Sequence, residues 1–174
     1  HSVSVSKHIT SFGNLSRQVS SHPFVPDDEH EADARALEIL SIQASGLARR
    51  MISANIEHLV IGLSGGLDST LALLVCLDAV SKLNLPLNNI MALTLPGPGT
   101  SEHTLTSVRD LAKASGISLK EIDINEAVES HLEDIGQAAH NYDRVFENAQ
   151  ARERTQILFD YANKVNGLVV GTGD

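Results

Sequence analysis

The sequence has only one cysteine, Cys76, so the chain cannot form a disulfide bond within itself. Cys76 lies in an apolar stretch, where we expect it to pack in the core. The lack of a disulfide framework is typical of cytoplasmic proteins, and we expect that location. No apolar run reaches the roughly 20 residues that a membrane-spanning helix needs, and no signal-peptide pattern is visible. We therefore expect no membrane partner.

Basic residues are also scarce: 13 lysines and arginines stand against 22 acidic residues, which gives a net charge of −9. Nucleic-acid binding needs clustered lysine and arginine, so we expect no nucleic-acid partner. The eight histidines are scattered without the spacing of metal ligands, and none is assigned to a metal. A length of 174 residues with 42% apolar residues fits one ordinary domain with its own core.

The rest of the chain is organised around one stretch, residues 58–70. Its apolar run, Leu59 to Leu63, is short and β-branched in the middle, which predicts a buried parallel strand. A second apolar run, residues 71–77, is too long for one strand and is flanked by polar residues, which predicts a buried helix. The sequence Ser-Gly-Gly-Leu-Asp-Ser at 64–69 joins the two.

This joining loop has the features of a phosphate site. Gly65 and Gly66 permit positive φ and let a ligand approach the backbone closely. The first amides of the following helix have no partner within the helix, and with the helix dipole they form an anion site. Ser64 and Ser69 add hydroxyl donors. Asp68 would repel a phosphate unless it binds a divalent cation that bridges to it; the plain alternative is a tight turn with an acid in the first helical turn.

The loop lacks the Gly-Lys-Ser/Thr ending of a Walker loop and also lacks G-x-G-x-x-G. It resembles the S-G-G-x-D-S pyrophosphate loop of the ATP pyrophosphatase (PP-loop) superfamily. Members of that superfamily cleave ATP between the α- and β-phosphates and adenylate an acid or carbonyl oxygen. A nitrogen or sulfur nucleophile then displaces AMP. The resemblance implies the Rossmann-like fold called adenine nucleotide alpha-hydrolase-like.

The other elements are expected on both sides of this centre. Residues 1–26 are polar and rich in serine, and we expect a linker or the tail of an upstream domain. Apolar periodicity and turn residues predict a helix from residue 27 to about 54, a strand at 90–95, a helix between an N-cap at Ser101 and a stop at Gly116, a strand at 119–124, helices at 125–133 and 144–164, and a strand at 168–170. This alternation predicts an α/β protein with a doubly wound parallel sheet.

Two further parts of the chain contain candidate site residues. Asp123 comes at the end of the third strand and either faces the site or only starts the next turn. On the last helix, Asn148, Arg152 and Thr155 fall on one face. The alternative is that this part of the helix is only a solvated face with salt bridges, formed by Glu147, Arg152, Glu153 and Arg154.

The final thirty residues resemble one branch of the superfamily, the NAD synthetases. Residues 146–154 are similar to that family's N-x-x-A-R-x-R helix, and residues 171–174 are similar to the start of its G-T-G-D-L-S-E segment. Residues 92–98 and 22–26 resemble the long, glutamine-dependent form, in which an amidase domain precedes the synthetase and supplies ammonia. The resemblance covers residues 22–174.

The resemblance implies a ligase in which ATP adenylates the nicotinate carboxylate of deamido-NAD and ammonia, derived from glutamine, displaces AMP to leave NAD. It implies Mg²⁺, with Asp68 as its ligand and as the catalytic residue, and a homo-oligomer in which the dinucleotide lies near a dimer interface. It assigns deamido-NAD binding to Asn148 and Arg152. It assigns ATP binding to Gly62, Leu63, Ser64, Gly65, Gly66, Leu67, Asp68, Ser69 and Thr172. Arg154 matches the motif without an assigned role.

The sequence also departs from the family pattern. The second Mg²⁺ ligand of the family, the Glu of G-T-G-D-L-S-E, would come just after Asp174, and the amidase machinery with its cysteine is absent. We therefore expect residues 27–174 to be the first part of a synthetase domain, truncated at its C-terminal end. Two other functions stay open: another amidating PP-loop enzyme of the GMP synthetase type, or a non-catalytic ATP-binding module.

Overall fold

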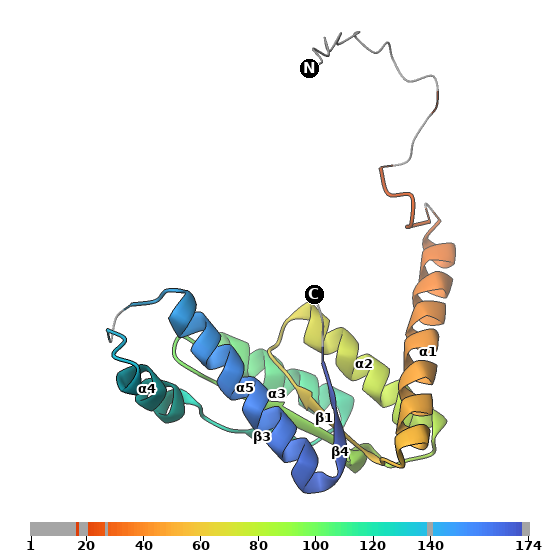
Figure 1. The fold of residues 1–174 in the computed structure, drawn as a ribbon. Coiled ribbons are helices and arrows are strands. Elements are labelled where there is room, and N and C mark those ends of the chain that lie inside the picture. The colour runs from red at the N-terminus through yellow and green to blue at the C-terminus, as the bar shows by residue number, and fades with distance from the viewer. Residues whose placement is uncertain (1–16, 18–20, 27, 139–140, 172–174) are drawn as a thin grey trace, which may run out of the picture. The chain divides into compact units, whose positions relative to one another are not determined.

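The structure is a computed structural model that describes residue 17 and residues 21–26, 28–138 and 141–171. Its contacts divide the chain into two compact units, His1–Leu37 and Glu38–Asp174. The secondary-structure elements follow in the order α1 (Glu29–Ala54), β1 (His58–Gly62), α2 (Leu67–Lys82), the 3-10 turn η1 (Leu87–Asn89), β2 (Ile90–Thr94), α3 (Glu102–Ser115), β3 (Leu119–Glu121), α4 (Asn125–Asp134), α5 (Arg144–Val165) and β4 (Gly167–Val170). The helices and strands follow in the order that the sequence predicts (Figure 1), whereas η1 was not predicted.

In the first unit, the segment before α1 is tied to the helix by hydrogen bonds. The carboxylate of Asp28 accepts the backbone N–H of Glu31 (2.9 Å), as an acid at a helix start does. One turn later, Arg35 donates from Nη1 to the carbonyl of Phe24 (3.2 Å). The first turn of this helix is acidic, with Glu29 and Glu31.

In the second unit, the four strands form one parallel sheet in the order β3-β2-β1-β4. The chain moves outward from β1 through β2 to β3, and then crosses to the other side of β1 to form β4. At the centre, Ile61 pairs with Ala92 on one side and with Val170 on the other. In sheets of this kind, ligands bind beyond the carboxyl ends of the strands where the order reverses.

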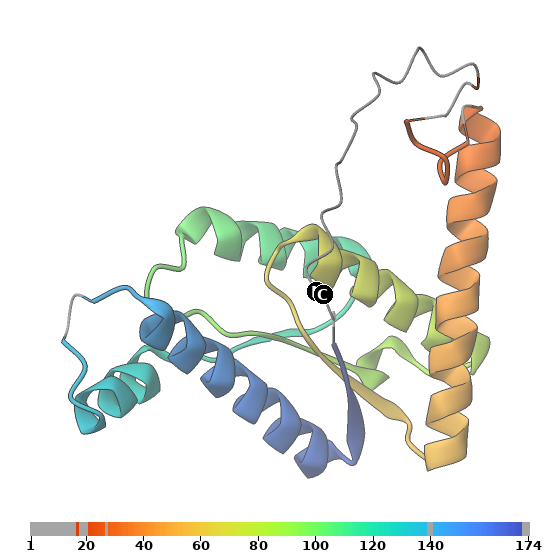
Figure 2. The same cartoon turned by 45° about the horizontal axis from the view of Figure 1, so that its top comes forward.

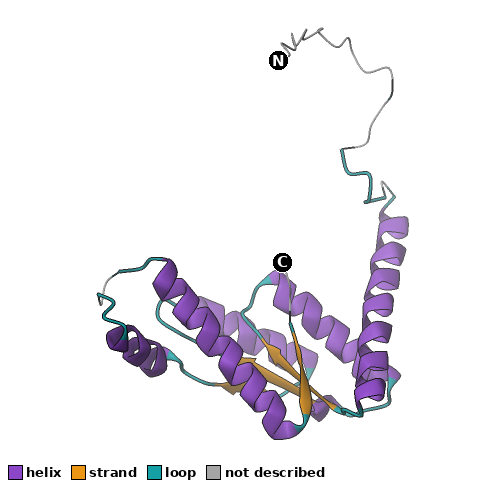
Figure 3. Ribbon diagram, viewed as in Figure 1, coloured by secondary structure: helices purple, strands orange, loops and turns teal. Residues whose placement is uncertain are grey.

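Helices cover both faces of the sheet, so the predicted doubly wound α/β class is confirmed. Because side chains alternate along a strand, Leu59 and Ile61 pack on one face with Leu73 of α2. Val60 points to the other face and packs with Ala162 of α5. Figure 2 shows α2 and α3 on one side of the strands and α5 on the other, and Figure 3 shows the strands as the middle layer.

The ends of α3 and α5 are set by local residues. Ser101 accepts the N–H of Thr104 at the start of α3 (3.2 Å), and Gly116 ends this helix with φ +69°, both as predicted. Asp143 begins α5 by accepting the backbone N–H of Val145 (2.8 Å). Desolvation alone would raise the pKa of Asp143, but the hydrogen bonds that its carboxylate accepts outweigh it and lower this pKa.

The third strand is shorter than predicted, because β3 ends at Glu121 rather than at residue 124. Ile122 and Ile124 still donate backbone hydrogen bonds to Thr94 (3.0 Å) and Pro96 (2.9 Å), but their side chains turn into the cluster under α4 and α5. The carboxylate of Asp123 accepts the backbone N–H of Asn125 (2.7 Å) and so starts the turn into α4. In the described range, no helix combines the length and apolarity needed to cross a membrane.

Candidate functional site

Serine side chains hold the loop between β1 and α2 in shape. The backbone N–H of Ser64 donates to the Oγ of Ser69 (3.3 Å), and the two hydroxyls lie 3.2 Å apart. Ser69 Oγ also donates to the carbonyl of Gly66 (3.0 Å), while the N–H of Gly66 donates to Ser64 Oγ (3.3 Å). Ser69 is buried and Ser64 is exposed. The loop is therefore already organised, with one hydroxyl facing solvent.

The two loop glycines have different roles. Gly65 adopts φ +78°, which confirms that the loop uses a positive φ, and a Cβ there would meet Val108 at 3.3 Å. Gly66 has φ −81° and is the N-cap of α2, but no side chain caps this helix. The first amides of α2 therefore keep the free donors that make a helix N-terminus attractive to anions.

A cavity of about 540 Å³ opens at the carboxyl ends of β1 and β2. Its walls come from the end of β1 and the serine loop, from residues 93–96 at the end of β2, from residues 98–101 and Thr104 around the start of α3, and from α5. The cavity thus lies at the edge where ligands bind in parallel α/β sheets. The rigid loop after β2 and the start of α3 close one wall.

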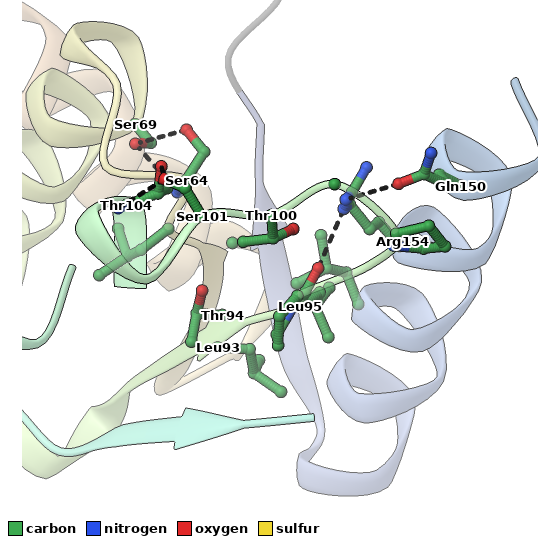
Figure 4. Close-up of a pocket in the computed structure, with 16 residues that line it drawn as sticks. Ser64, Ser69, Leu93, Thr94, Leu95, Thr100, Ser101, Thr104, Gln150 and Arg154 are labelled. Carbon is green, nitrogen blue, oxygen red and sulfur yellow. Dashed lines mark hydrogen bonds between the residues drawn. The ribbon is translucent and has the colours of Figure 1, made fainter. Parts of the chain in front are cut away.

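Polar side chains lie at both ends of the cavity, and Thr100 lies between them (Figure 4). Ser64 and Ser69 lie with Ser101 at one end. Gln150 and Arg154, both on α5, lie at the other end. The cavity can therefore receive a ligand that has hydrogen-bond acceptors or anionic groups at both of its ends.

Arg154 is fixed by two hydrogen bonds and has no acidic partner. Its Nε donates to the carbonyl of Leu95 (3.1 Å), and its Nη2 donates to Gln150 Oε1 (3.2 Å). Desolvation lowers the pKa of Arg154, but a guanidinium stays protonated at physiological pH. No carboxylate of the described chain lies within ion-pair distance of it.

Asn148 and Arg152 lie on another face of α5, away from this cavity. Both are exposed and, with Thr155, line a separate open depression of about 410 Å³. The prediction that these three residues share a face is confirmed. Neither Arg152 nor Glu147 forms an ion pair with a described residue, and both are exposed. The alternative of a solvated face therefore stays open.

Asp68 lies in the first turn of α2, exposed, and its carboxylate has no hydrogen bond or ion pair with any described residue. No group of three or more possible metal ligands occurs among the described residues. A single free carboxylate still fits Mg²⁺, which is commonly bound by one or two carboxylates together with substrate phosphates and water.

The structure therefore brings together only part of the residues expected to bind ATP. The residues that line the cavity are Gly62, Leu63, Ser64 and Ser69. Four other residues of the same stretch are exposed and do not line the cavity: Gly65, Gly66, Leu67 and Asp68. Thr172, the ninth residue in this group, lies outside the described residues. Asp123 is not among the cavity residues.

The inward position of Gln150 and Arg154 was missed from the sequence, although a signal for it exists. The apolar residues Leu158 and Ala162 are spaced by four residues and mark the buried stripe of this helix. Counting back from Leu158 in steps of four residues reaches Arg154 and then Gln150, so the stripe extends to the cavity.

The prediction that Cys76 packs in the core is confirmed. Cys76 is buried, and burial raises the pKa of its thiol to about 12, which makes the thiol unreactive.

A parallel sheet with a cavity at the carboxyl ends of its strands, beside a glycine-rich loop and a helix N-terminus, defines a Rossmann-like α/β protein. The sequence model described as NAD synthase matches residues 39–174, and the chain therefore belongs to the NAD synthase family.

Individual relatives agree with this assignment. The chain is 42% identical over 164 residues to the glutamine-dependent NAD(+) synthetase of Mycobacterium tuberculosis, covering 92% of this chain and 24% of that protein. It is 29% identical over 145 residues to the NH(3)-dependent NAD(+) synthetase of Fusobacterium nucleatum, covering 83% and 53%. The chain thus spans about a quarter of the length of the glutamine-dependent relative.

The fold is also found in a solved synthetase. The structure of glutamine-dependent NAD+ synthetase from Acinetobacter baumannii in complex with ADP is similar with a TM-score of 0.71 and 27% identity. The similarity covers 79% of this chain and 26% of that chain.

Proposed function

We propose that this chain is the ATP-binding part of a ligase that makes NAD. ATP adenylates the carboxylate of deamido-NAD and releases pyrophosphate, and ammonia then displaces AMP to form the amide. The observation that carries the proposal is the preorganised serine loop on the cavity at the strand ends, in a chain of the NAD synthase family. The family match disfavours a GMP synthetase-like enzyme and a non-catalytic module.

Catalysis of this kind depends on positioning and on charge neutralisation. In the proposed complex, the Ser64 and Ser69 hydroxyls and the first amides of α2 hold the phosphates of ATP. Asp68 binds Mg²⁺, which neutralises phosphate charge and helps pyrophosphate to leave. Gly62 and Leu63 form the wall beside the phosphates.

The second substrate is assigned to the outer face of α5. We propose that Asn148 and Arg152 contact deamido-NAD there, with the amide offering both donor and acceptor groups and the guanidinium binding an anionic group. Because this face is exposed, a second copy of the chain can cover it, in keeping with a homo-oligomer. Glutamine as the source of ammonia is supported by the 42% identity to a glutamine-dependent relative. A cytoplasmic location stays a prediction.

Binding titrations test this function directly. The 174-residue chain is expected to bind ATP more tightly with Mg²⁺ than without it, and to bind deamido-NAD. Asp68→Asn should remove most of the Mg²⁺ dependence while the unfolding temperature changes little. Asp110→Asn, an exposed acid on α3, is the matched control. A chain that binds ATP but shows no response to deamido-NAD would favour another PP-loop enzyme, and unchanged Mg²⁺ dependence in Asp68→Asn would exclude Asp68 as the ligand.

A further inference from the structure

Arg154 is the only charged residue among the described residues that line the 540 Å³ cavity. The other lining residues are apolar residues, glycines, prolines, hydroxyl residues and Gln150. The chain carries 22 acidic residues and a net charge of −9, yet none of the described carboxylates pairs with Arg154. A partly buried cation without an internal partner costs free energy, which an anionic ligand would offset.

The guanidinium keeps free hydrogen-bond donors. It has five N–H groups, of which Nε bonds to the carbonyl of Leu95 and Nη2 bonds to Gln150 Oε1. Nη1 has no partner among the described residues. The planar fork is thus anchored along one side and has unused donors on the other. This geometry suits an oxyanion, which a guanidinium can bind through two parallel hydrogen bonds.

The anchor itself is rigid. Gln150 is only 7% exposed, and its Oε1 lies 2.8 Å from the position that a Cβ on Gly97 would take. The same position is 3.0 Å from Ile124. The loop after β2 is therefore packed tightly against α5, and Arg154 is oriented before any ligand binds.

We propose that Arg154 binds an oxyanion of the ligand, either a phosphate or a carboxylate, at the end of the cavity opposite Ser64 and Ser69. The proposal rests on the proposed function for the identity of the ligands. It makes Arg154 a direct binding residue, distinct from Arg152, which lies on the outer face of the same helix. The two arginines thereby serve two different anionic groups.

The test compares Arg154→Gln, Arg154→Lys and the wild-type chain by calorimetric titration. Arg144→Gln, an exposed arginine at the start of α5 with no partner in the described chain, is the matched control. The probes form two pairs: ATP against adenosine, which removes the phosphates, and deamido-NAD against NAD, which replaces the carboxylate by an amide. Inorganic pyrophosphate is a fifth probe. The unfolding temperature of each variant shows whether it is folded.

Arg154→Gln is expected to lower the affinity for one anionic probe about tenfold to a hundredfold, which is the range of one hydrogen bond to a charged group. The affinity for the other probe of the pair, which lacks that anionic group, should change little. Loss for ATP but not adenosine identifies a phosphate, and loss for deamido-NAD but not NAD identifies the carboxylate. Arg154→Lys, which keeps the charge but loses the fork, should recover part of the affinity. Arg144→Gln should match the wild type with every probe.

The opposing outcomes separate this proposal from the proposed function. A loss for adenosine as large as the loss for ATP would show that Arg154 only shapes the wall through Leu95 and Gln150, which overturns the proposal. An equal loss for deamido-NAD and NAD supports a phosphate contact only if pyrophosphate also binds more weakly; without that, it overturns the proposal. Unchanged affinities for both nucleotides would overturn it while leaving the function intact. If the wild type binds neither nucleotide, the function fails, and the proposal then stands only if pyrophosphate binds and depends on Arg154.

Discussion

At the scale of single residues, Gly65 shows how one backbone angle supports a site. Its φ of +78° is open to glycine but strained for a β-branched residue, and a Cβ would press on Val108 and on the carbonyl of Thr104. Gly65→Val is expected to distort the serine loop, at a cost of at least about 1–2 kcal/mol for the backbone alone. It should abolish Mg-ATP binding, measured by titration. Unchanged affinity would remove the argument that this loop binds phosphate.

Arg154 shows what the spacing of a pair alone could not decide at this scale. Asn148 with Arg152, and Gln150 with Arg154, are both spaced by four residues, so this spacing does not separate the pairs; the register with Leu158 does. Only the packing of α5 on β1 through Leu158 and Ala162 turns one pair inward. Gly65, by contrast, could be predicted because positive φ in a tight loop is a property of the residue itself.

At the scale of elements, Gly116 and Gly46 give a matched pair of substitutions. Gly116 ends α3 with φ +69°, and Gly46 lies exposed inside α1 with nothing near its missing Cβ. Gly116→Ala should lower the free energy of unfolding by about 1 kcal/mol because of the left-handed backbone. Gly46→Ala should raise it by roughly 0.5–1 kcal/mol because alanine favours a helix. Urea denaturation measures both, and equal signs would contradict this assignment of the helix end.

The contact between α3 and β3 predicts a pH dependence. Arg109 donates from Nε and Nη2 to the carboxylate of Glu121 (2.7 and 2.9 Å) and from Nη1 to Glu102 (2.7 Å). The hydrogen bonds from Arg109 hold the pKa of Glu121 below its ordinary value of 4.5. A carboxylate with a lowered pKa stabilises the fold above the unfolded value and loses this contribution as the pH falls through the folded value.

The stability difference between the wild type and Arg109→Gln should therefore be largest at about pH 7 and shrink towards about pH 3. Urea midpoints at the two pH values measure it, with Arg50→Gln on the exposed side of α1 as the control. A difference that does not change with pH would show that the ion pairs of Arg109 do not contribute to folding. High salt should reduce the effect, because all three groups are exposed.

The order of the elements could be predicted because β1, β2 and β4 are short apolar runs and α3 has a clear N-cap and a clear end signal. The length of β3 could not. Ile122 and Ile124 continue the alternation of a strand, and the sequence alone does not show that their side chains leave the sheet to pack with Val128 under α4. Asp123 ends the ladder by bonding to Asn125, which is a local choice that competes with strand pairing.

At the scale of the whole molecule, the cavity is built from segments far apart in sequence. Gly62, Leu95 and Arg154 come from β1, the end of β2 and α5, and they meet only because the sheet order reverses at β1. The reversal could be expected from the family resemblance, but the contact of Arg154 with Leu95 could not. The structure also places the cavity and the depression lined by Asn148 and Arg152 on different faces of α5.

This separation makes a kinetic prediction for Arg152 in the complete synthetase that carries this chain. Arg152 lies exposed beside Asn148, away from the cavity, so Arg152→Ala should affect deamido-NAD and leave ATP alone. Loss of one charge-assisted contact, on the order of 1.5–3 kcal/mol, should lower kcat/KM for deamido-NAD about tenfold to a hundredfold. The KM for ATP should change little. Steady-state kinetics with each substrate varied in turn measures the split, with Arg144→Gln as the control on the same helix.

A different result is expected if Arg152 contacts only solvent. A solvated arginine would change stability by no more than about 0.5 kcal/mol and would leave both KM values and kcat unchanged. In that case Arg152 is only a surface residue, and the outer face of α5 is not the deamido-NAD site. A change in the KM for ATP alone would place Arg152 with the nucleotide cavity, against its position in the fold. Only a selective effect on deamido-NAD agrees with two substrate faces on one helix.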